Sequence, residues 1–178
     1  MTIFLSGGAK NGKSSLAQDL AVKLSGDGPR YYVATMIPVD EEDRQRIRNH
    51  VADRAGMGFD TIECGRQILS CLDGVDRNGT FLLDSVTALL MNEMFRGDEV
   101  DSFAGERCAE ELAAFVRSVK NAVIVSDAIY SDAARYDEIT ELYRTALAHA
   151  DRAAAAACDT VVEMVAGQPI IYKGGLPL

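Results

Sequence analysis

A glycine-rich segment between a short apolar run and a helical pattern constrains this chain more than any other feature of its sequence. Gly7–Ser14 reads GGAKNGKS and fits the pattern G-x-x-x-x-G-K-[ST] at every fixed position. The apolar run Thr2–Leu5 precedes it, and the spacing after it predicts a helix over Lys13–Leu24. Strand, loop and helix in this order point backbone N–H groups and a helix N-terminus at one concavity. The segment therefore predicts a phosphate site; a glycine-rich turn without a ligand is the alternative.

Two side chains of this loop and one further carboxylate carry the predicted chemistry. We expect Lys13 to reach the terminal phosphates of a nucleotide and the Ser14 hydroxyl to hold Mg²⁺. Asp84 ends the buried-type strand Thr80–Asp84, at the edge of an α/β sheet where ligands bind. Asp84 is therefore the expected carboxylate on the Mg²⁺ side, directly or through water. A helix N-cap before the predicted helix Ser85–Phe95 is the alternative for this aspartate.

Short apolar, β-branched runs alternate with helical patterns along the whole sequence. The predicted strands are Thr2–Ser6, Tyr31–Thr35, Phe59–Glu63, Thr80–Asp84, Ala122–Ser126, Thr160–Val165 and Pro169–Lys173, and the predicted helices are Lys13–Leu24, Asp40–Arg54, Arg66–Leu72, Ser85–Phe95, Glu106–Lys120 and Tyr136–Ala157. This alternation predicts a three-layer α/β fold of the P-loop NTPase type, with a mostly parallel sheet. Only Ala166–Gln168 separates the last two strands, which predicts a C-terminal antiparallel hairpin. We expect a single domain, 1–178, with an exposed polar loop at Arg96–Ser102.

Composition excludes several classes of protein. The net charge of −9 and the pI near 4.7 argue against a general nucleic-acid-binding protein. The four cysteines include no C-x-x-C pair and there are two histidines, so a Cys/His zinc site is not expected. No signal peptide pattern and no run of about 18 apolar residues is present, which predicts a cytoplasmic protein without a membrane span.

The segment from Asp40 to Arg54 has the most unusual charge pattern. Acidic residues come first and arginines follow, which complements the helix dipole and is typical of a solvated helix. Arg46, His50 and Arg54 are spaced by four residues and share one stripe of this predicted helix. Two guanidinium groups beside an imidazole form a local anion site in which His50 can act as a nucleophile. A surface histidine is the alternative, and it is our interpretation of His149 in the last helix.

With these features established, the sequence resembles the bifunctional adenosylcobinamide kinase / adenosylcobinamide-phosphate guanylyltransferase family of cobalamin assembly. The likeness covers most of the chain. It rests on SGGAKNGKS at Ser6–Ser14, YVAT at Tyr32–Thr35, Arg46-Ile47 with His50 and Arg54, T-I-E at Thr61–Glu63, L-L-D at Leu82–Asp84, Thr87 with Asn92, and Val125-Ser126. Many proteins share the loop alone, whereas loop, YVAT, histidine helix and T-x-E in this order are much more specific.

The resemblance implies two reactions with nucleotides. In the first, the terminal phosphate of ATP or GTP passes to the aminopropanol hydroxyl of adenosylcobinamide, a corrinoid. In the second, GTP guanylylates a histidine, pyrophosphate leaves, and GMP moves to the cobinamide phosphate. The matching residues are Lys13 in the loop and His50 as the guanylylated histidine. The family also implies Mg²⁺ and a homotrimer with active sites near subunit interfaces.

The same resemblance implies a set of nucleotide contacts. The expected residues are Gly7, Gly8, Ala9, Lys10, Asn11, Gly12, Lys13, Ser14, Ala34, Thr35, Met36, Val51, Ala52, Asp53, Arg54, Glu63 and Asp84, with Ser14 and Asp84 on the metal side. Glu63 ends its predicted strand near the same edge, where it can bind ribose hydroxyls or the guanine edge. A structural Glu63 that caps the following segment is the alternative.

The chain departs from the family pattern at three places. Ala55-Gly56 replaces Arg-Pro after the histidine helix, Asp127–Tyr130 replaces Asn-Glu-Val-Gly, and Ala148–Arg152 replaces Gly-x-x-Asn-Gln. These changes cluster where the acceptor, rather than the nucleotide, is expected to be held. Two other functions therefore stay open: a small-molecule kinase with a different acceptor, and a nucleotide-binding regulatory protein that hydrolyses slowly.

Overall fold

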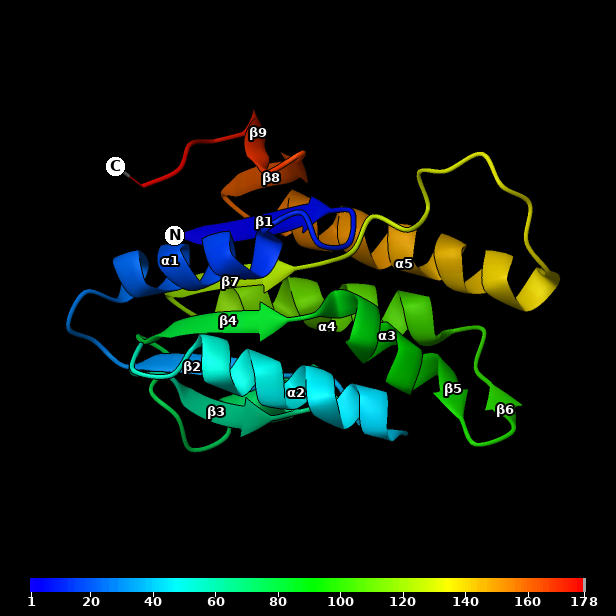
Figure 1. Ribbon diagram of the computed structural model, residues 1–178, viewed down its shortest axis with the longest axis horizontal. Helices are drawn as coiled ribbons and strands as arrows, with labels where there is room; N and C mark the ends of the chain where they lie inside the picture. Colours follow the sequence, from blue (N-terminus) through cyan, green and yellow to red (C-terminus); the bar gives the residue numbers. More distant parts are fainter. Residues whose placement is uncertain (178) are drawn as a thin grey trace.

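The computed structural model describes residues 1–177, which form one seven-stranded sheet with helices on both faces (Figure 1). The strands are β1 (Thr2–Gly7), β2 (Arg30–Ala34), β3 (Asp60–Glu63), β4 (Thr80–Asp84), β5 (Phe95–Arg96), β6 (Glu99–Val100), β7 (Asn121–Val125), β8 (Thr160–Val165) and β9 (Gln168–Lys173). The helices are α1 (Lys13–Ser25), α2 (Glu41–Asp53), α3 (Val86–Met94), α4 (Ala104–Ser118) and α5 (Glu138–Ala157), with a 3₁₀ helix at Ile68–Leu72.

The order of the sheet is β3-β2-β4-β7-β1-β8-β9. All neighbouring strands are parallel except β8 and β9, which form the C-terminal antiparallel hairpin. This confirms the fold class predicted from the alternation of strands and helices. Because the carboxyl ends of β1, β4 and β7 lie at the same edge (Figure 1), the segments that follow these strands meet there.

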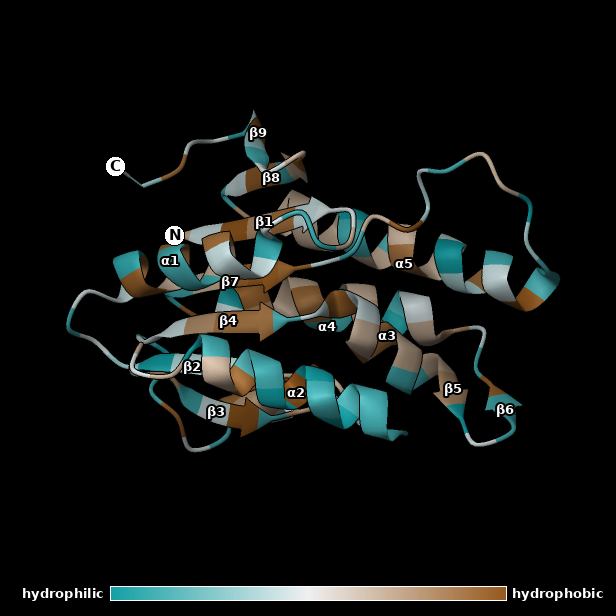
Figure 2. Cartoon of the chain, viewed as in Figure 1, coloured by the Kyte–Doolittle hydropathy of each residue, from teal (hydrophilic) through white to brown (hydrophobic). Residues whose placement is uncertain are grey.

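Alternating side chains of the central strands form two apolar layers. Ile3, Leu5 and Leu82 pack with Ala17 and Leu20 of α1 on one face. The intervening residues of the same strands pack against α3, α4 and α5 on the other face. This is the pattern of strands that are buried on both faces, as parallel sheets require. Figure 2 shows the difference from α2, whose residues are mostly hydrophilic.

Two local predictions differ from the structure. Over Arg66–Leu72, the structure has only the short 3₁₀ helix, preceded by Gln67 in a left-handed conformation; such tight helices occur in short pieces. The segment Arg96–Ser102, expected as a loop, includes part of a two-stranded ribbon formed by β5 and β6. Within residues 1–177, no helix combines the length and the apolarity needed to cross a membrane.

Candidate functional site

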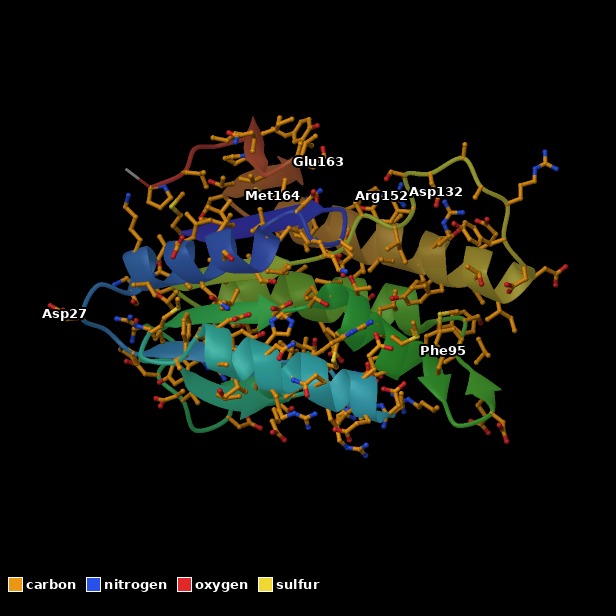
Figure 3. The ribbon with its side chains drawn as sticks, viewed as in Figure 1. Asp27, Phe95, Asp132, Arg152, Glu163 and Met164 are labelled. Atoms are coloured by element: carbon orange, nitrogen blue, oxygen red, sulfur yellow. The ribbon has the colours of Figure 1, made fainter. Side chains whose placement is uncertain are left out.

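The phosphate loop is shaped by its contact with β8. Gly7 has φ 144°, and a Cβ atom there would lie 2.6 Å from the carbonyl oxygen of Met164, which Figure 3 labels. Asn11 Nδ2 donates to the same carbonyl at 3.1 Å. Gly12 adopts a left-handed conformation as the N-cap of α1, so both glycines permit backbone conformations that other residues rarely adopt. These contacts and conformations fix the curved form of the loop.

Lys13 is nearly buried at the start of α1, with 6% of its side chain exposed. Its Nζ donates to the Gly8 carbonyl oxygen at 2.6 Å and lies 2.8 Å from Asp127 Oδ1. An ammonium group has three donors, so one remains for a phosphate oxygen. Lys13 therefore begins α1 as the sequence predicted, and its carboxylate partner is Asp127.

Asp84 lies at the carboxyl end of β4 and accepts a hydrogen bond from Tyr32 Oη at 2.8 Å. Burial raises the pKa of Asp84, and the nearby charge of Asp127 acts in the same direction. The alternative of an N-cap is wrong for Asp84, because Ser85 caps α3 by accepting from the Ala88 N–H. A cation beside Asp84 would reduce the electrostatic repulsion between the carboxylates of Asp84 and Asp127. Mg²⁺ is bound through one or two carboxylates and substrate phosphates, so this carboxylate and the loop hydroxyl suit that ion.

A pocket of about 370 Å³ opens between α2 and the sheet edge. It is lined by Tyr32, Ala34, Met36, Pro38, Arg44, Ile47, Arg48, His50, Arg54, Glu63, Asp84, Ser85 and Ala88. His50 Nδ1 is one of two buried side-chain polar atoms in residues 1–177 that have no hydrogen-bond partner. A buried polar atom without a partner is costly and therefore points to a ligand or a reaction at this ring. Asp84 also lines this pocket, at the carboxyl edge of the sheet where the phosphate loop follows β1.

Arg54 is the buried arginine among the three that line this pocket. It is 8% exposed, and its guanidinium carbon lies 3.9 Å from the centroid of the Tyr32 ring. Its Nη2 donates to Thr61 Oγ1 at 3.1 Å. Burial, and next the charge of Asp84, raises the pKa of Tyr32, so the Tyr32 hydroxyl remains a donor to Asp84. Arg54, Tyr32 and Asp84 therefore form one connected floor of the pocket.

Arg46 is not brought into the pocket with His50 and Arg54. Its side chain is 57% exposed and pairs with Glu42 at 2.6 Å on the outer surface of α2. Because a four-residue step exceeds one helical turn of 3.6 residues, a stripe of two such steps drifts around the helix axis. Arg44 and Arg48 line the pocket instead, and no local pattern in the sequence singles them out.

Several expected nucleotide contacts lie outside the pocket lining. Val51, Ala52 and Asp53 are exposed at the end of α2. Thr35 is fully buried, and its Oγ1 donates to the Ser85 carbonyl oxygen at 2.8 Å. This side chain holds the ends of β2 and β4 together. By contrast, Ala34, Met36 and Glu63 line the pocket as expected.

Two of the three unusual segments noted in the sequence, Asp127–Tyr130 and Ala148–Arg152, meet near the phosphate loop. Asp151 of α5 is 2% exposed, and its Oδ2 accepts from Ser126 Oγ at 3.0 Å and Tyr130 Oη at 2.9 Å. Its Oδ1 is the second buried atom without a partner. Burial raises the pKa of Asp151 to about 7. The sequence predicted that these segments cluster away from the nucleotide, whereas Asp127 contacts Lys13 of the phosphate loop. His149 is exposed on α5, as expected.

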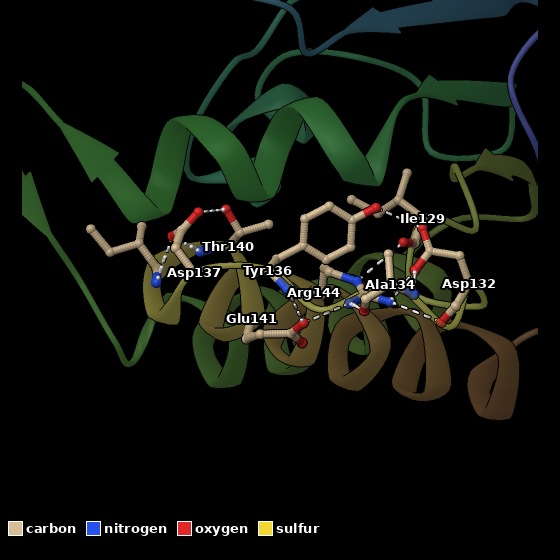
Figure 4. A network of polar contacts seen from close by, with 9 residues as sticks. Ile129, Asp132, Ala134, Tyr136, Asp137, Thr140, Glu141 and Arg144 are labelled. Atoms are coloured by element: carbon tan, nitrogen blue, oxygen red, sulfur yellow. Dashed lines mark hydrogen bonds and ion pairs between the residues drawn. The ribbon is translucent and has the colours of Figure 1, made fainter.

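The loop after Tyr130 is fastened to α5 by a buried arginine (Figure 4). Arg144 pairs with Asp132 at 2.9 Å and with Glu141 at 2.8 Å. Its guanidinium carbon also lies 4.7 Å from the ring centroid of Tyr136. These contacts hold the loop between β7 and α5 in place, and Asp127 lies at the start of that loop.

The chain matches a family profile over residues 3–171. That family is described as cobinamide kinase / cobinamide phosphate guanyltransferase. Comparison with curated proteins finds no significant match.

Solved structures are similar to the chain in fold. One solved ATPase domain aligns with a TM-score of 0.57 and 11% identity, over 99% of this chain and 78% of that chain. A KaiC-like protein from the hyperthermophilic archaeon Pyrococcus horikoshii OT3 aligns with a TM-score of 0.55 and 12% identity, over 97% and 78% of the two chains. At this identity, the likeness shows a shared P-loop ATPase fold.

Proposed function

The chain belongs to the cobinamide kinase / cobinamide phosphate guanyltransferase family, and on that premise we propose that it carries out both reactions at one continuous site. The first reaction phosphorylates adenosylcobinamide with ATP or GTP. The second transfers GMP from GTP, through a guanylyl-histidine, to give adenosyl-GDP-cobinamide. The observation that carries the proposal is Asp84, which lines the pocket with His50 at the same sheet edge as the phosphate loop.

The phosphate loop performs the first reaction by binding and alignment. Backbone N–H groups of Gly7–Ser14 and the remaining donor of Lys13 hold the terminal phosphates. Ser14 and Asp84 would hold Mg²⁺, which neutralises charge that develops on the transferred phosphate. Phosphoryl transfer needs little more than this positioning and electrostatic stabilisation.

His50 performs the second reaction as a nucleophile. Its ring attacks the α-phosphorus of GTP through Nε2, since Nδ1 is enclosed, and pyrophosphate leaves. Arg54 lies beside it, where a guanidinium group stabilises the charge on the phosphate. Glu63 at the end of β3 lines the same pocket and would contact the ribose or the guanine. The proposal includes a homotrimer of single-domain subunits in the cytoplasm, which the family resemblance supports.

Product analysis tests this function. The protein is incubated with Mg²⁺, GTP and adenosylcobinamide, and the corrinoids are analysed by mass spectrometry. We expect cobinamide phosphate to appear first and GDP-cobinamide later. Phosphorylation without guanylylation would reduce the function to a single-activity kinase, whereas GTP hydrolysis without any corrinoid product would exclude both transferase reactions.

A further inference from the structure

Asp127 lies just after a central strand of the sheet, between the phosphate loop and the segment that contains Asp84. It follows β7, which lies between β1 and β4, so its neighbours are the phosphate loop and Asp84. The Asp127 N–H donates to Thr87 Oγ1 at 2.9 Å, and the next N–H, of Ala128, donates to the Gly7 carbonyl oxygen at 3.1 Å. The backbone at Asp127 is therefore held by α3 on one side and by the loop on the other.

The carboxylate of Asp127 touches Lys13 and is also partly exposed. Its Oδ1 lies 2.8 Å from Lys13 Nζ, and 36% of the side chain is exposed, compared with 6% for Lys13. Lys13 uses a second donor on Gly8 and keeps its third for phosphate. Asp127 can therefore stay beside Lys13 while a nucleotide is bound.

The other carboxylates near Lys13 are already engaged or enclosed. Asp84 accepts the Tyr32 hydroxyl and is the expected carboxylate on the Mg²⁺ side. Asp151 is 2% exposed and accepts two hydroxyl donors, so it cannot touch a substrate. Among the described residues, Asp127 is thus the carboxylate that pairs with Lys13 and retains an open face.

We propose that Asp127 is the general base of the phosphoryl transfer, an inference that rests on the proposed kinase activity. The acceptor hydroxyl loses its proton to the Asp127 carboxylate as its oxygen bonds to the terminal phosphorus. The bond from that phosphorus to the bridging oxygen breaks, and the nucleoside diphosphate leaves with the bonding pair. Because Lys13 holds the terminal phosphates, a hydroxyl that attacks them comes within reach of the group beside Lys13.

Asparagine at position 127 is the substitution that isolates this role. An amide has the same shape and can accept a hydrogen bond from Lys13, but it cannot take up a proton. Asp127→Asn therefore separates proton transfer from the positioning of Lys13.

Single-turnover transfer from γ-labelled ATP to cobinamide tests the role, with excess enzyme and Mg²⁺. Binding of a non-hydrolysable ATP analogue is measured by calorimetry on the same variants. For Asp127→Asn we expect the transfer rate to fall by about 10²–10⁴-fold, the usual contribution of a general base, and the affinity for the analogue to change less than about threefold. Formate should raise the transfer rate of Asp127→Ala by at least about tenfold, because it can replace the missing carboxylate base. It should leave the transfer rate of Lys13→Ala unchanged, because that variant lacks an ammonium group instead. Asp98→Asn, on the exposed β5–β6 turn, is the control.

Three results would overturn the inference: a transfer rate for Asp127→Asn within about threefold of wild type, no formate rescue of Asp127→Ala, or a loss of rate matched by a loss of nucleotide affinity. In each of these cases the wild-type protein still phosphorylates cobinamide. Wild-type protein that phosphorylates no cobinamide is a different result, which rejects the proposed kinase function together with this role.

Discussion

The phosphate loop Gly7–Ser14 and helix α2 face the same site, but the rest of the molecule holds them differently. The loop joins two buried elements, β1 and α1, and its glycine at position 7 packs directly on β8. Helix α2 has no fully buried residue and few contacts with other elements. Its N-cap, Asp40, and the acidic first turn stabilise it locally. It lines the pocket through Arg44, Ile47, Arg48 and His50, and its C-cap Arg54 stacks on Tyr32.

This difference bears on the two proposed reactions, phosphoryl transfer at the loop and guanylylation at α2. A phosphate site that is part of the core depends on core packing, so substitutions there should affect both folding and phosphoryl transfer. A helix without a buried face can shift when a nucleotide enters. We therefore expect substitutions in α2 to change guanylylation while stability stays nearly constant.

Lys13→Ala should give the largest effect and test the role of the phosphate loop in phosphoryl transfer. The substitution removes a donor to the terminal phosphates and leaves Asp127 without its partner. We expect phosphoryl transfer to fall by about 10²–10³-fold, as for loss of one donor that stabilises transition-state charge. Lys23→Ala, on the exposed face of the same helix, is the matched control. Equal rates for the two variants would mean that the loop does not bind the transferred phosphate.

Gly7→Ala should test whether the loop is rigid because it packs on β8. The added Cβ would lie 2.6 Å from the Met164 carbonyl oxygen, at a φ of 144° that alanine rarely adopts. We expect the free energy of unfolding to fall by about 3 kcal/mol in urea titrations. Gly175→Ala, where a Cβ meets nothing within 4 Å, should be nearly neutral. A neutral Gly7→Ala would show that the loop can move away from β8.

Asp151 should make the stability of the folded protein depend on pH. Its pKa is about 7 in the folded protein and about 4 in an unfolded chain. Between these values the folded state keeps a proton that the unfolded state has lost, so stability falls as the pH rises towards 7. Relative to Asp151→Asn, wild type should lose about 2–3 kcal/mol of unfolding free energy from pH 5 to pH 8. Parallel pH profiles of the two proteins in denaturant titrations would contradict this assignment.

Arg54→Ala and Arg46→Ala should give the smallest effects and separate the two faces of α2. Arg54 stacks on Tyr32 inside the pocket, whereas Arg46 forms an exposed ion pair with Glu42. We expect Arg54→Ala to weaken GTP binding by about 1–2 kcal/mol and Arg46→Ala by less than about 0.5 kcal/mol, in calorimetric titrations. Equal losses would restore the Arg46–His50–Arg54 stripe as the anion site.

The same difference explains how much the sequence could predict. β1, its loop and α1 follow from local patterns, because strand burial, glycine positions and helix spacing are all encoded in neighbouring residues. The sequence also predicts that Lys13 and Asp84 lie at the same edge of the sheet, since parallel strands bring their carboxyl ends together. The helix predicted over Arg66–Leu72 was wrong in type, because helical spacing over so few residues does not distinguish an α-helix from a 3₁₀ helix.

The rest of the site depends on contacts between distant segments. Asp127 pairs with Lys13, and Tyr32 bonds to Asp84, across strands that are neighbours only in the folded sheet. The rotation of α2 decides that Arg48 rather than Arg46 lines the pocket. No local pattern fixes that rotation, because α2 has no buried face to orient it.

Covalent labelling tests the central claim most directly: that the phosphate loop and α2 serve two different reactions at one site. The protein is incubated with Mg²⁺ and α-labelled GTP, denatured, and analysed for acid-labile, base-stable label. We predict label on wild type, none on His50→Ala, and phosphoryl transfer to cobinamide that His50→Ala retains within a few-fold. Undiminished label on His50→Ala, or no label on a wild type that still phosphorylates cobinamide, would contradict the account.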